Sequence, residues 1–212
     1  MPQKFSSYAR IGVPSDPLVQ NEYLPARIAA GFERISEVIR VLIRDAALRL
    51  GISHLGAQFL DFIAHHPHLR CTVSDLAAEF NVSLPTASDA VKTLVKKGLI
   101  EKIADPEDSR SKILRLTPEG FENAKIIAEA LTPFSELISE ILVSDRKDFW
   151  DSMSKIIFLA ARKGIISQPR MCYSCRFFEK RSDRGFCRLM NCPLPPAKIR
   201  LDCPEFSKAE AE

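Results

Sequence analysis

Residues 83–98 read SLPTASDAVKTLVKKG and predict a helix with defined ends. Ser83 is a favoured N-cap residue, and Pro85 is tolerated in a first helical turn. Lys96, Lys97 and Gly98 favour the C-terminus, because cations stabilise the negative end of the helix dipole and glycine accepts a left-handed backbone. The apolar residues recur with helical spacing, so we expect this set to pack inward: Ala87, Ala90, Val91, Leu94 and Val95.

A shorter helix is predicted just before this one. Ser74 caps residues 75–80, and Asn81, which tolerates the left-handed region, follows at a tight turn. Two helices joined in this way form a helix-turn-helix, whose second helix can enter the major groove of duplex DNA. We call that second helix, predicted over residues 84–97, the recognition helix.

The polar face of the recognition helix suits DNA. Thr86 and Ser88 lie near its start, where short side chains can reach base edges. Lys92 and Lys96 lie further along and are expected to meet phosphate, a contact that adds affinity without reading sequence. Ordinary solvated helices also carry such faces, so the hairpin that follows has to support the interpretation.

A β-hairpin is predicted directly after the recognition helix. Residues 99–103 and 112–116 are expected to be short strands, and the polar, turn-prone segment 105–111 joins them. From Ser83 to Thr117 there are seven Lys and Arg residues against five acidic residues, so the placement of the cations matters more than their excess. The two helices and the hairpin together predict a winged helix-turn-helix.

The hairpin also carries a family resemblance. DSR at 108–110, followed by LRLTPEG at 114–120, resembles the wing signature of the MarR family of transcription regulators. Residues 74–77 and 83–99 fit that family's helix-turn-helix as well, and the likeness covers about residues 23–165. Pro85 is a departure from the family pattern.

The resemblance implies how such a protein would work. It implies a homodimer held together by the first and last long helices, on a pseudo-palindromic site with half-sites about 34 Å apart. It also implies that Arg110 enters the minor groove while Asp108 orients Arg110 or its neighbours. A small-molecule effector is a further partner that MarR-like dimers often hold, although no residue here identifies one. The predicted DNA-binding residues are Ser83, Pro85, Thr86, Ser88, Lys92, Lys96, Asp108, Arg110 and Lys112.

The remaining chain divides into three parts. Residues 1–22, with three prolines and no periodicity, predict an extended N-terminal arm. Residues 23–167 are expected to form the winged helix-turn-helix and dimerisation domain, in which amphipathic helices over about 25–50, 54–64, 118–143 and 145–163 flank the DNA-reading elements. Residues 168–212 form what we call the Cys-rich module. The predicted fold class is mainly α, with a small β-wing and this added module.

Five of the six cysteines fall within the Cys-rich module, where their spacing is that of a metal site. Cys172 and Cys175 form a Cys-x2-Cys turn, and Cys187 and Cys203 are the favoured other half of a four-thiolate set. Cys192 is either an alternative ligand or a bystander. Cys71 is expected to be a small buried apolar residue.

Zinc is the predicted metal, and a [4Fe–4S] cluster is the alternative. Both carry a charge of −2 with four thiolates, so charge does not choose between them. A single Cys-x2-Cys turn favours zinc, whereas aromatic neighbours and the Cys-Pro pairs at 192–193 and 203–204 favour a cluster. Redox-active thiols without a metal remain a third interpretation.

Composition excludes several other classes of protein. The chain has 212 residues, 46% of them hydrophobic and 27% charged, as in a globular protein rather than a disordered one. No apolar run approaches the length of a membrane span, and residues 1–10 show no secretory signal, so we expect a cytoplasmic protein. The net charge of +3 does not by itself indicate nucleic-acid binding. No nucleophile elbow or phosphate loop is present, so an enzyme is not predicted.

The function predicted from the sequence is a sequence-specific, double-stranded-DNA-binding transcriptional regulator, favoured as a repressor over an activator. Its tail would hold a metal that is structural or senses metal or redox state. The alternative is a protein-interaction module, or a redox protein carrying a cluster, that uses the helix-turn-helix only as a dimer scaffold.

Overall fold

The computed structural model describes residues 13–108, 110–141, 143–181 and 184–209. Its helices are α1 (Pro17–Glu22), α2 (Leu24–Arg49), α3 (His54–His65), α4 (Val73–Glu79), α5 (Leu84–Lys96), α6 (Pro118–Glu129), α7 (Thr132–Ser139) and α8 (Val143–Arg162). The strands are β1 (Ile100–Ala104), β2 (Lys112–Leu116), β3 (Phe178–Arg181), β4 (Arg184–Cys187) and β5 (Cys192–Leu194), and two short 3-10 turns are η1 (Cys172–Ser174) and η2 (Pro196–Lys198).

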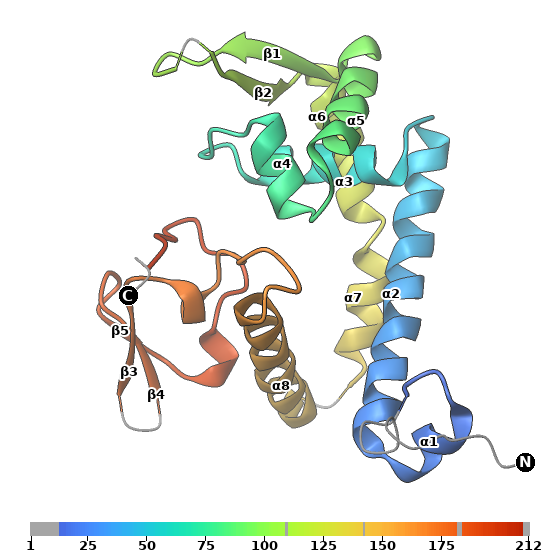
Figure 1. The fold of residues 1–212 in the computed structure, drawn as a ribbon, viewed down its shortest axis with the longest axis vertical. Helices are drawn as coiled ribbons and strands as arrows, with labels where there is room; N and C mark the ends of the chain where they lie inside the picture. The colour runs from blue at the N-terminus through green and yellow to red at the C-terminus, as the bar shows by residue number, and fades with distance from the viewer. Residues whose placement is uncertain (1–12, 109, 142, 182–183, 210–212) are drawn as a thin grey trace, which may run out of the picture.

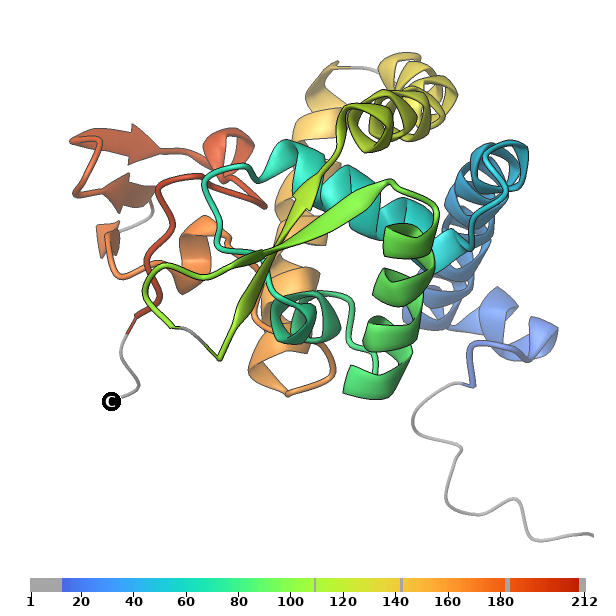
Figure 2. The same ribbon diagram turned by 90° about the horizontal axis from the view of Figure 1, so that it is seen from above.

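A winged-helix lobe occupies one end of the molecule (Figure 1). It contains α3, α4, α5, the start of α6 and the antiparallel pair β1–β2, in which Ile100 lies opposite Leu116. Phe59, Leu60, Leu76, Leu94 and Leu114 are among its fully buried side chains. Seen from above, the β1–β2 hairpin reaches outward past α4 (Figure 2). The predicted winged fold is therefore confirmed.

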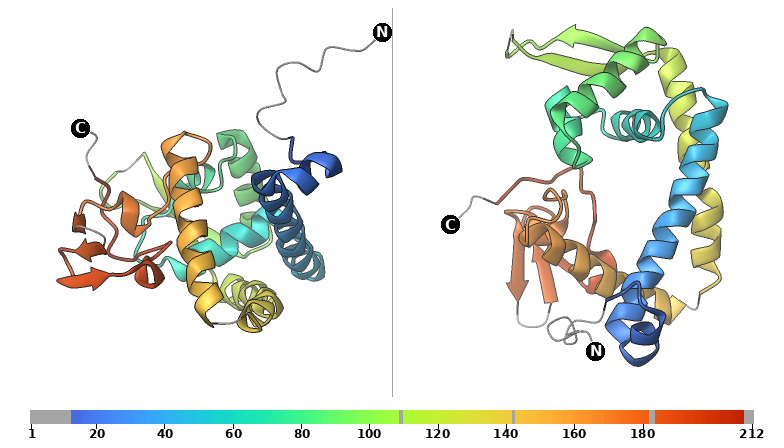
Figure 3. Two further views of the ribbon diagram at one scale, coloured as in Figure 1. Left: turned by 90° about the horizontal axis from the view of Figure 1, so that it is seen from below. Right: turned by 45° about the vertical axis from the view of Figure 1, so that its right-hand side comes forward.

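Long helices extend away from this lobe. α6 and α7 run beside α2 on one side of the molecule, whereas α8 diverges from α2 and lies against the Cys-rich module (Figures 1 and 3). Between α6 and α7 the helix restarts at Leu131, because Pro133 lacks the N–H that an uninterrupted helix requires. Phe149 of α8 stacks on Phe32 of α2, with 6.3 Å between ring centroids.

The Cys-rich module has its own small core. Its strands form a three-stranded antiparallel sheet in the order β3-β4-β5, with Cys187 opposite Cys192. Met171 is fully buried there beneath Ile157 and Phe158 of α8. The module is thus built against α8 rather than standing free.

Three local predictions are wrong. Part of the supposed extended arm is helical, because Asp16 caps α1 by accepting the N–H of Leu18 at 2.9 Å; residues 1–12 lie outside the described residues. α4 begins earlier than predicted, since Thr72 rather than Ser74 is its cap and forms a reciprocal capping box with Asp75. Val95 is exposed, whereas Ala87, Val91 and Leu94 are buried as predicted.

Within the described ranges, no helix combines the length and apolarity needed to cross a membrane.

Candidate nucleic-acid interface and cysteine pocket

The recognition helix is fixed at its start by hydroxyl groups. The Oγ atom of Ser83 accepts the N–H of Thr86 at 3.2 Å, as an N-cap does, and the hydroxyls of the two residues are 2.7 Å apart. Asn81 holds the preceding turn with a φ of 53°. The Thr86 hydroxyl is therefore engaged in the cap but remains at the surface.

The outward face of α5 has the predicted polar and basic character. Pro85, Thr86, Lys92 and Lys96 are exposed, while Ser88 is half-buried and less accessible than its position in the sequence suggested. The Nζ atom of Lys92 lies 2.9 Å from Asp89, an exposed pair that solvent screens strongly. Such a pair can open when a phosphate approaches. The apolar face packs inward, so the helix is firmly attached while its polar face points to solvent.

The wing, formed by β1, β2 and the loop between them, carries its predicted cations at the same end of the molecule as α5. Arg110 and Lys112 are exposed. A carboxylate oxygen of Asp108 accepts the backbone N–H of Arg110 at 3.0 Å, and its carbonyl accepts the N–H of Ser111 at 2.9 Å. Asp108 thus orders the turn that presents Arg110, and its role on DNA stays a prediction. Ser109 lies outside the described residues.

A second anchor of the wing was not foreseen from the sequence. Arg70, in the loop before α4, forms ion pairs with both Asp105 and Glu107 at the start of the wing loop. The hydrogen bond from Arg70, together with the N–H of Glu107, lowers the pKa of the Asp105 carboxyl. In addition, Leu114 of β2 donates its N–H to the carbonyl of Cys71 at 2.7 Å. We call the Arg70, Asp105 and Glu107 contacts the wing clip, which joins two segments about 35 residues apart.

All five cysteines of the Cys-rich module line one pocket. Its walls are otherwise mostly apolar and include Phe177, Phe178, Leu189, Met190 and Leu194, with Arg200 and Glu205 at the polar side. The fold therefore brings together the predicted ligands Cys172, Cys175, Cys187 and Cys203, and Cys192 with them. Among the residues that the structure describes, no three histidine, cysteine or acidic side chains are close enough to hold one metal ion.

Several hydrogen bonds point at the sulfur atoms of this pocket. The backbone N–H of Arg200 donates to Cys172 Sγ at 3.2 Å, and that of Met190 donates to Cys187 Sγ at 3.4 Å. The Arg200 guanidinium donates to Cys203 Sγ at 3.6 Å. Burial raises the pKa of the Cys172 thiol, so a bound cation would be needed to hold it as a thiolate at neutral pH.

Cys71 has a different environment. It is buried in the core of the winged-helix lobe, where burial and the nearby Asp75 and Glu79 raise the pKa of its thiol to about 12. A thiol with so high a pKa reacts slowly with oxidants. This supports its predicted role as a packing residue.

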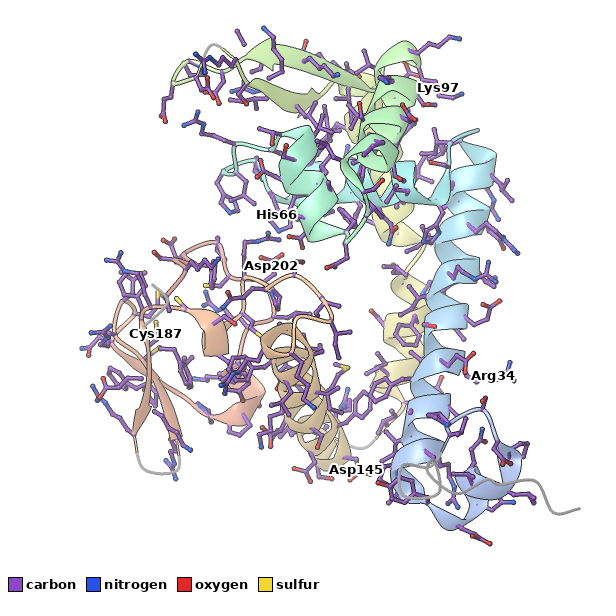
Figure 4. The ribbon with its side chains drawn as sticks, viewed as in Figure 1. Arg34, His66, Lys97, Asp145, Cys187 and Asp202 are labelled. Atoms are coloured by element: carbon purple, nitrogen blue, oxygen red, sulfur yellow. The ribbon has the colours of Figure 1, made fainter. Side chains whose placement is uncertain are left out.

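Arg170 connects the Cys-rich module to the helix-turn-helix. Its guanidinium contacts Glu79 of α4 at 2.8 Å and Asp202 at 2.9 Å, and it lies 4.9 Å above the ring of Phe62. His66 completes the group by contacting Asp202 at 2.7 Å (Figure 4). Of the three histidines at 65–68, one therefore serves docking, which no local sequence signal indicated.

The turn between α4 and α5 is part of the same contact. Asn81 lies two residues before the cap residue Ser83. Its side-chain oxygen accepts the backbone N–H of Ser167 at 2.6 Å. On the module side, the backbone N–H of Cys203 donates to the carbonyl of Arg170 at 3.0 Å. A short chain of contacts thus runs from a pocket cysteine to the turn that positions the recognition helix.

The described geometry agrees with comparisons to known proteins. Residues 50–111 match the profile of the MarR family. The MarR-like segment thus spans α3 to the wing loop. The chain is 32% identical over 85 residues to the HTH-type transcriptional regulator BilQ of Clostridioides difficile (strain CD3), a match that covers 40% of this chain and 53% of BilQ. The chain therefore spans about half the length of that relative.

Solved structures show the same fold. The MepR–DNA complex of S. aureus superimposes with a TM-score of 0.54 at 20% identity, covering 61% of this chain and 95% of MepR. S. aureus MepR in its DNA-binding conformation gives a TM-score of 0.56, also at 20% identity, and covers 61% of this chain and 96% of MepR. The helices around the wing therefore have the architecture of a MarR-type winged helix.

Proposed function

We propose that this protein is a sequence-specific, double-stranded-DNA-binding transcriptional regulator that acts as a homodimeric repressor. The observation that carries the proposal is the shared exposure of two basic surfaces at one end of the molecule: the polar face of α5 and the wing with Arg110. A helix for the major groove beside a cation for the minor groove is the arrangement that winged-helix proteins use on duplex DNA. The relatives described above, one of them solved with DNA, support it.

Exposed apolar side chains support the homodimer. Ile28, Ile35 and Val38 of α2 are 39–46% exposed, and Ile156 and Leu159 of α8 are about half exposed. Single exposed apolar residues are common, but a repeated set along the long helices is typical of an interface between subunits. The first and last long helices are those that the family resemblance assigns to dimerisation. A small-molecule effector stays a prediction.

The Cys-rich module enters the proposal through its docking contacts. Arg170 and Ser167 hold Glu79 and Asn81, which lie at the end of α4 and in the turn before α5. A change in the cysteine pocket that moves residues 202–203 would alter the contacts of Arg170 and Ser167, and so shift the turn before α5. We therefore include in the proposal a tail site that binds a metal centre and couples its state to DNA affinity.

The test is binding of the purified dimer to the duplex upstream of its own gene, measured by fluorescence anisotropy against a scrambled duplex. Arg110→Ala should weaken binding about tenfold or more, because a groove-inserted arginine is worth about 1–3 kcal/mol. Arg34→Ala is the matched control: this exposed arginine lies on α2, far from the wing (Figure 4), and its loss should leave affinity unchanged. Light scattering on both variants checks the dimer.

Lys96→Ala tests the phosphate contact separately. It should weaken binding to the specific and the scrambled duplex alike and reduce the slope of log affinity against log salt by about one. Equal affinity of the native protein for both duplexes would refute sequence-specific regulation, and an unchanged affinity of Arg110→Ala would refute the assigned role of the wing.

A further inference from the structure

We propose that a proton on His66 controls how tightly the Cys-rich module docks on the winged-helix lobe. The contact is strongest while both ring nitrogens of His66 carry a proton, and it weakens when the pH rises and the ring becomes neutral. Only the consequence for DNA rests on the proposed function, and the primary test does not require DNA.

Both ring nitrogens of His66 face hydrogen-bond acceptors. Nδ1 lies 2.7 Å from the carbonyl oxygen of Phe62, and Nε2 lies 2.7 Å from a carboxylate oxygen of Asp202 in the module (Figure 4). A carbonyl oxygen cannot donate, so Nδ1 has to carry a proton. Asp202 accepts from Arg170 at both of its oxygens, at 2.9 and 3.0 Å, which is the geometry of an ionised carboxylate. Nε2 therefore carries the second proton, and His66 is an imidazolium in this arrangement.

The charges of this contact balance when His66 is protonated. Glu79 and Asp202 bring two negative charges, and Arg170 contacts them at 2.8 and 2.9 Å. Arg170 and the imidazolium supply two positive charges. A neutral ring would leave one negative charge in excess and place the Nε2 lone pair 2.7 Å from the Asp202 oxygen. The side chains of His66 and Arg170 are only 13% and 16% exposed, so solvent screens this change weakly.

The other groups around His66 act in both directions. Its ring stacks on that of Phe62, with 4.1 Å between centroids, and the face of an aromatic ring attracts a cation. Asp61 interacts electrostatically with His66 and adds a further negative charge. The ring of His68, 5.9 Å away and exposed, would repel the imidazolium if it were protonated as well. The buried Asp202 pair is the closest charged contact, so it dominates this balance.

The neutral ring has an alternative partner. Nη2 of Arg170 lies 3.4 Å from Nε2 of His66, close enough to donate to it once the proton is lost. Asp202 would then lose its histidine donor and share that arm of the guanidinium. Histidine is the side chain whose charge ordinarily changes between about pH 5 and 8, so the contact can exchange one arrangement for the other within that range.

The exchange can reach the helix-turn-helix through a short segment. Arg170 contacts Asp202 in the module and Glu79 at the end of α4. Ser167, three residues earlier in the chain, donates its N–H to Asn81 in the turn before α5. Weakening of the Asp202 contact therefore loosens the segment that holds this turn.

The primary test uses the full-length protein with isotope-labelled histidine, titrated between about pH 5.5 and 8. Nuclear magnetic resonance should show two ring protons on His66 at the acidic end and one at the alkaline end. Over the same range, hydrogen exchange at the Ser167 amide, corrected for its intrinsic pH dependence, should become about tenfold faster, because a charge-assisted hydrogen bond is lost. A ring with one proton throughout, or unchanged corrected exchange, would overturn the proposal.

Glutamine variants test whether His66 is the titrating group. His66→Gln keeps a donor for Asp202 but cannot gain or lose a proton, so the corrected exchange at Ser167 should no longer depend on pH. His65→Gln is the matched control: His65 is exposed and lies 3.3 Å from Asp61 of its own helix, and its loss should preserve the pH response. The reverse result in the two variants would refute the assignment. Far-ultraviolet circular dichroism and the emission of Trp150, which donates to the carbonyl of Ile199 at 3.2 Å, check that each variant is folded.

A final comparison separates this inference from the function proposed above. Anisotropy titrations on the same duplex, at constant salt and at both ends of the pH range, compare the native protein with His66→Gln. We expect the affinity of the native protein to change more with pH than that of the variant, and equal changes would refute transmission to the recognition helix. Specific binding with pH-independent exchange at Ser167 would refute the proton switch alone, whereas pH-dependent exchange without specific binding would refute the regulator alone.

Discussion

Replacing Gly120 by alanine should strongly destabilise the winged-helix lobe. Gly120 lies in the first turn of α6, where its N–H donates to the cap residue Thr117 at 3.1 Å. A Cβ atom at this position would lie 1.9 Å from the carbonyl oxygen of Leu99 and 2.9 Å from its carbon. Since these are backbone atoms, they cannot rotate away as a side chain can.

The expected cost follows from what has to move. To reach an ordinary contact near 3.4 Å, α6 and the residue before β1 must separate by about 1.5 Å. That shift breaks the bond from Thr117 N–H to the Leu99 carbonyl at 3.1 Å and strains the bond from the Thr117 hydroxyl to Gly98 at 2.6 Å. Overpacking costs about 1–3 kcal/mol and the one lost hydrogen bond about 1 kcal/mol, so we expect a loss of about 2–4 kcal/mol.

Urea unfolding followed by circular dichroism measures this loss, and the melting temperature should fall by about 10 °C. Gly31→Ala is the matched control, because Gly31 lies within α2 and its added Cβ would meet nothing within 4 Å. That change should be neutral or stabilise by up to about 1 kcal/mol. If the free energy of unfolding of Gly120→Ala lies within about 0.5 kcal/mol of that of the native protein, α6 does not begin against Leu99 and the reasoning fails.

Two other substitutions test contacts that hold the lobe to its neighbours. Arg70→Ala should lower stability near neutral pH, because the lowered pKa of Asp105 contributes stability above its ordinary pKa and loses it as the pH falls through the lower folded value. Urea unfolding across acidic pH should show the two proteins converging, and a constant difference would contradict the wing clip. Arg170→Met should cost about 2 kcal/mol, because it leaves Glu79 and Asp202 without their shared cation. Faster hydrogen exchange at the amide of Ser167 would report the loosened module, and unchanged exchange would count against the docking contact.

Local sequence rules predicted the elements that local forces determine. Ser83 caps its helix as expected, because an N-cap needs only residues within one turn. Thr117 caps α6 in the same way. The start of α4 was misplaced because Thr72 and Ser74 both offer a hydroxyl, and the reciprocal bond with Asp75 decides between them. That signal was present in the sequence, since Thr72 and Asp75 have the spacing of a capping box.

Contacts between distant segments could not be predicted in the same way. His66 and Asp202 are separated by 136 positions, and no pattern in one segment identifies its partner in the other. The wing clip has the same origin, although its two segments are closer in the chain. The cysteine spacing predicted which side chains would gather in the Cys-rich module, and all five line one pocket, but it did not identify Arg200 and Glu205 as the polar residues that line the pocket with them.

The contact of Asn81 with Ser167 restricts which amino acids position 81 can accept during evolution. Its positive φ would suit glycine equally well or better, so backbone geometry alone does not call for asparagine. What glycine could not supply is the amide oxygen that holds Ser167. A shortened descendant lacking the tail would be released from that requirement and free to exchange the residue, whereas a descendant keeping the tail would not. Asparagine at position 81 should therefore be retained in descendants whose Cys-rich module still docks on the winged-helix lobe, and should vary in those that have lost the module.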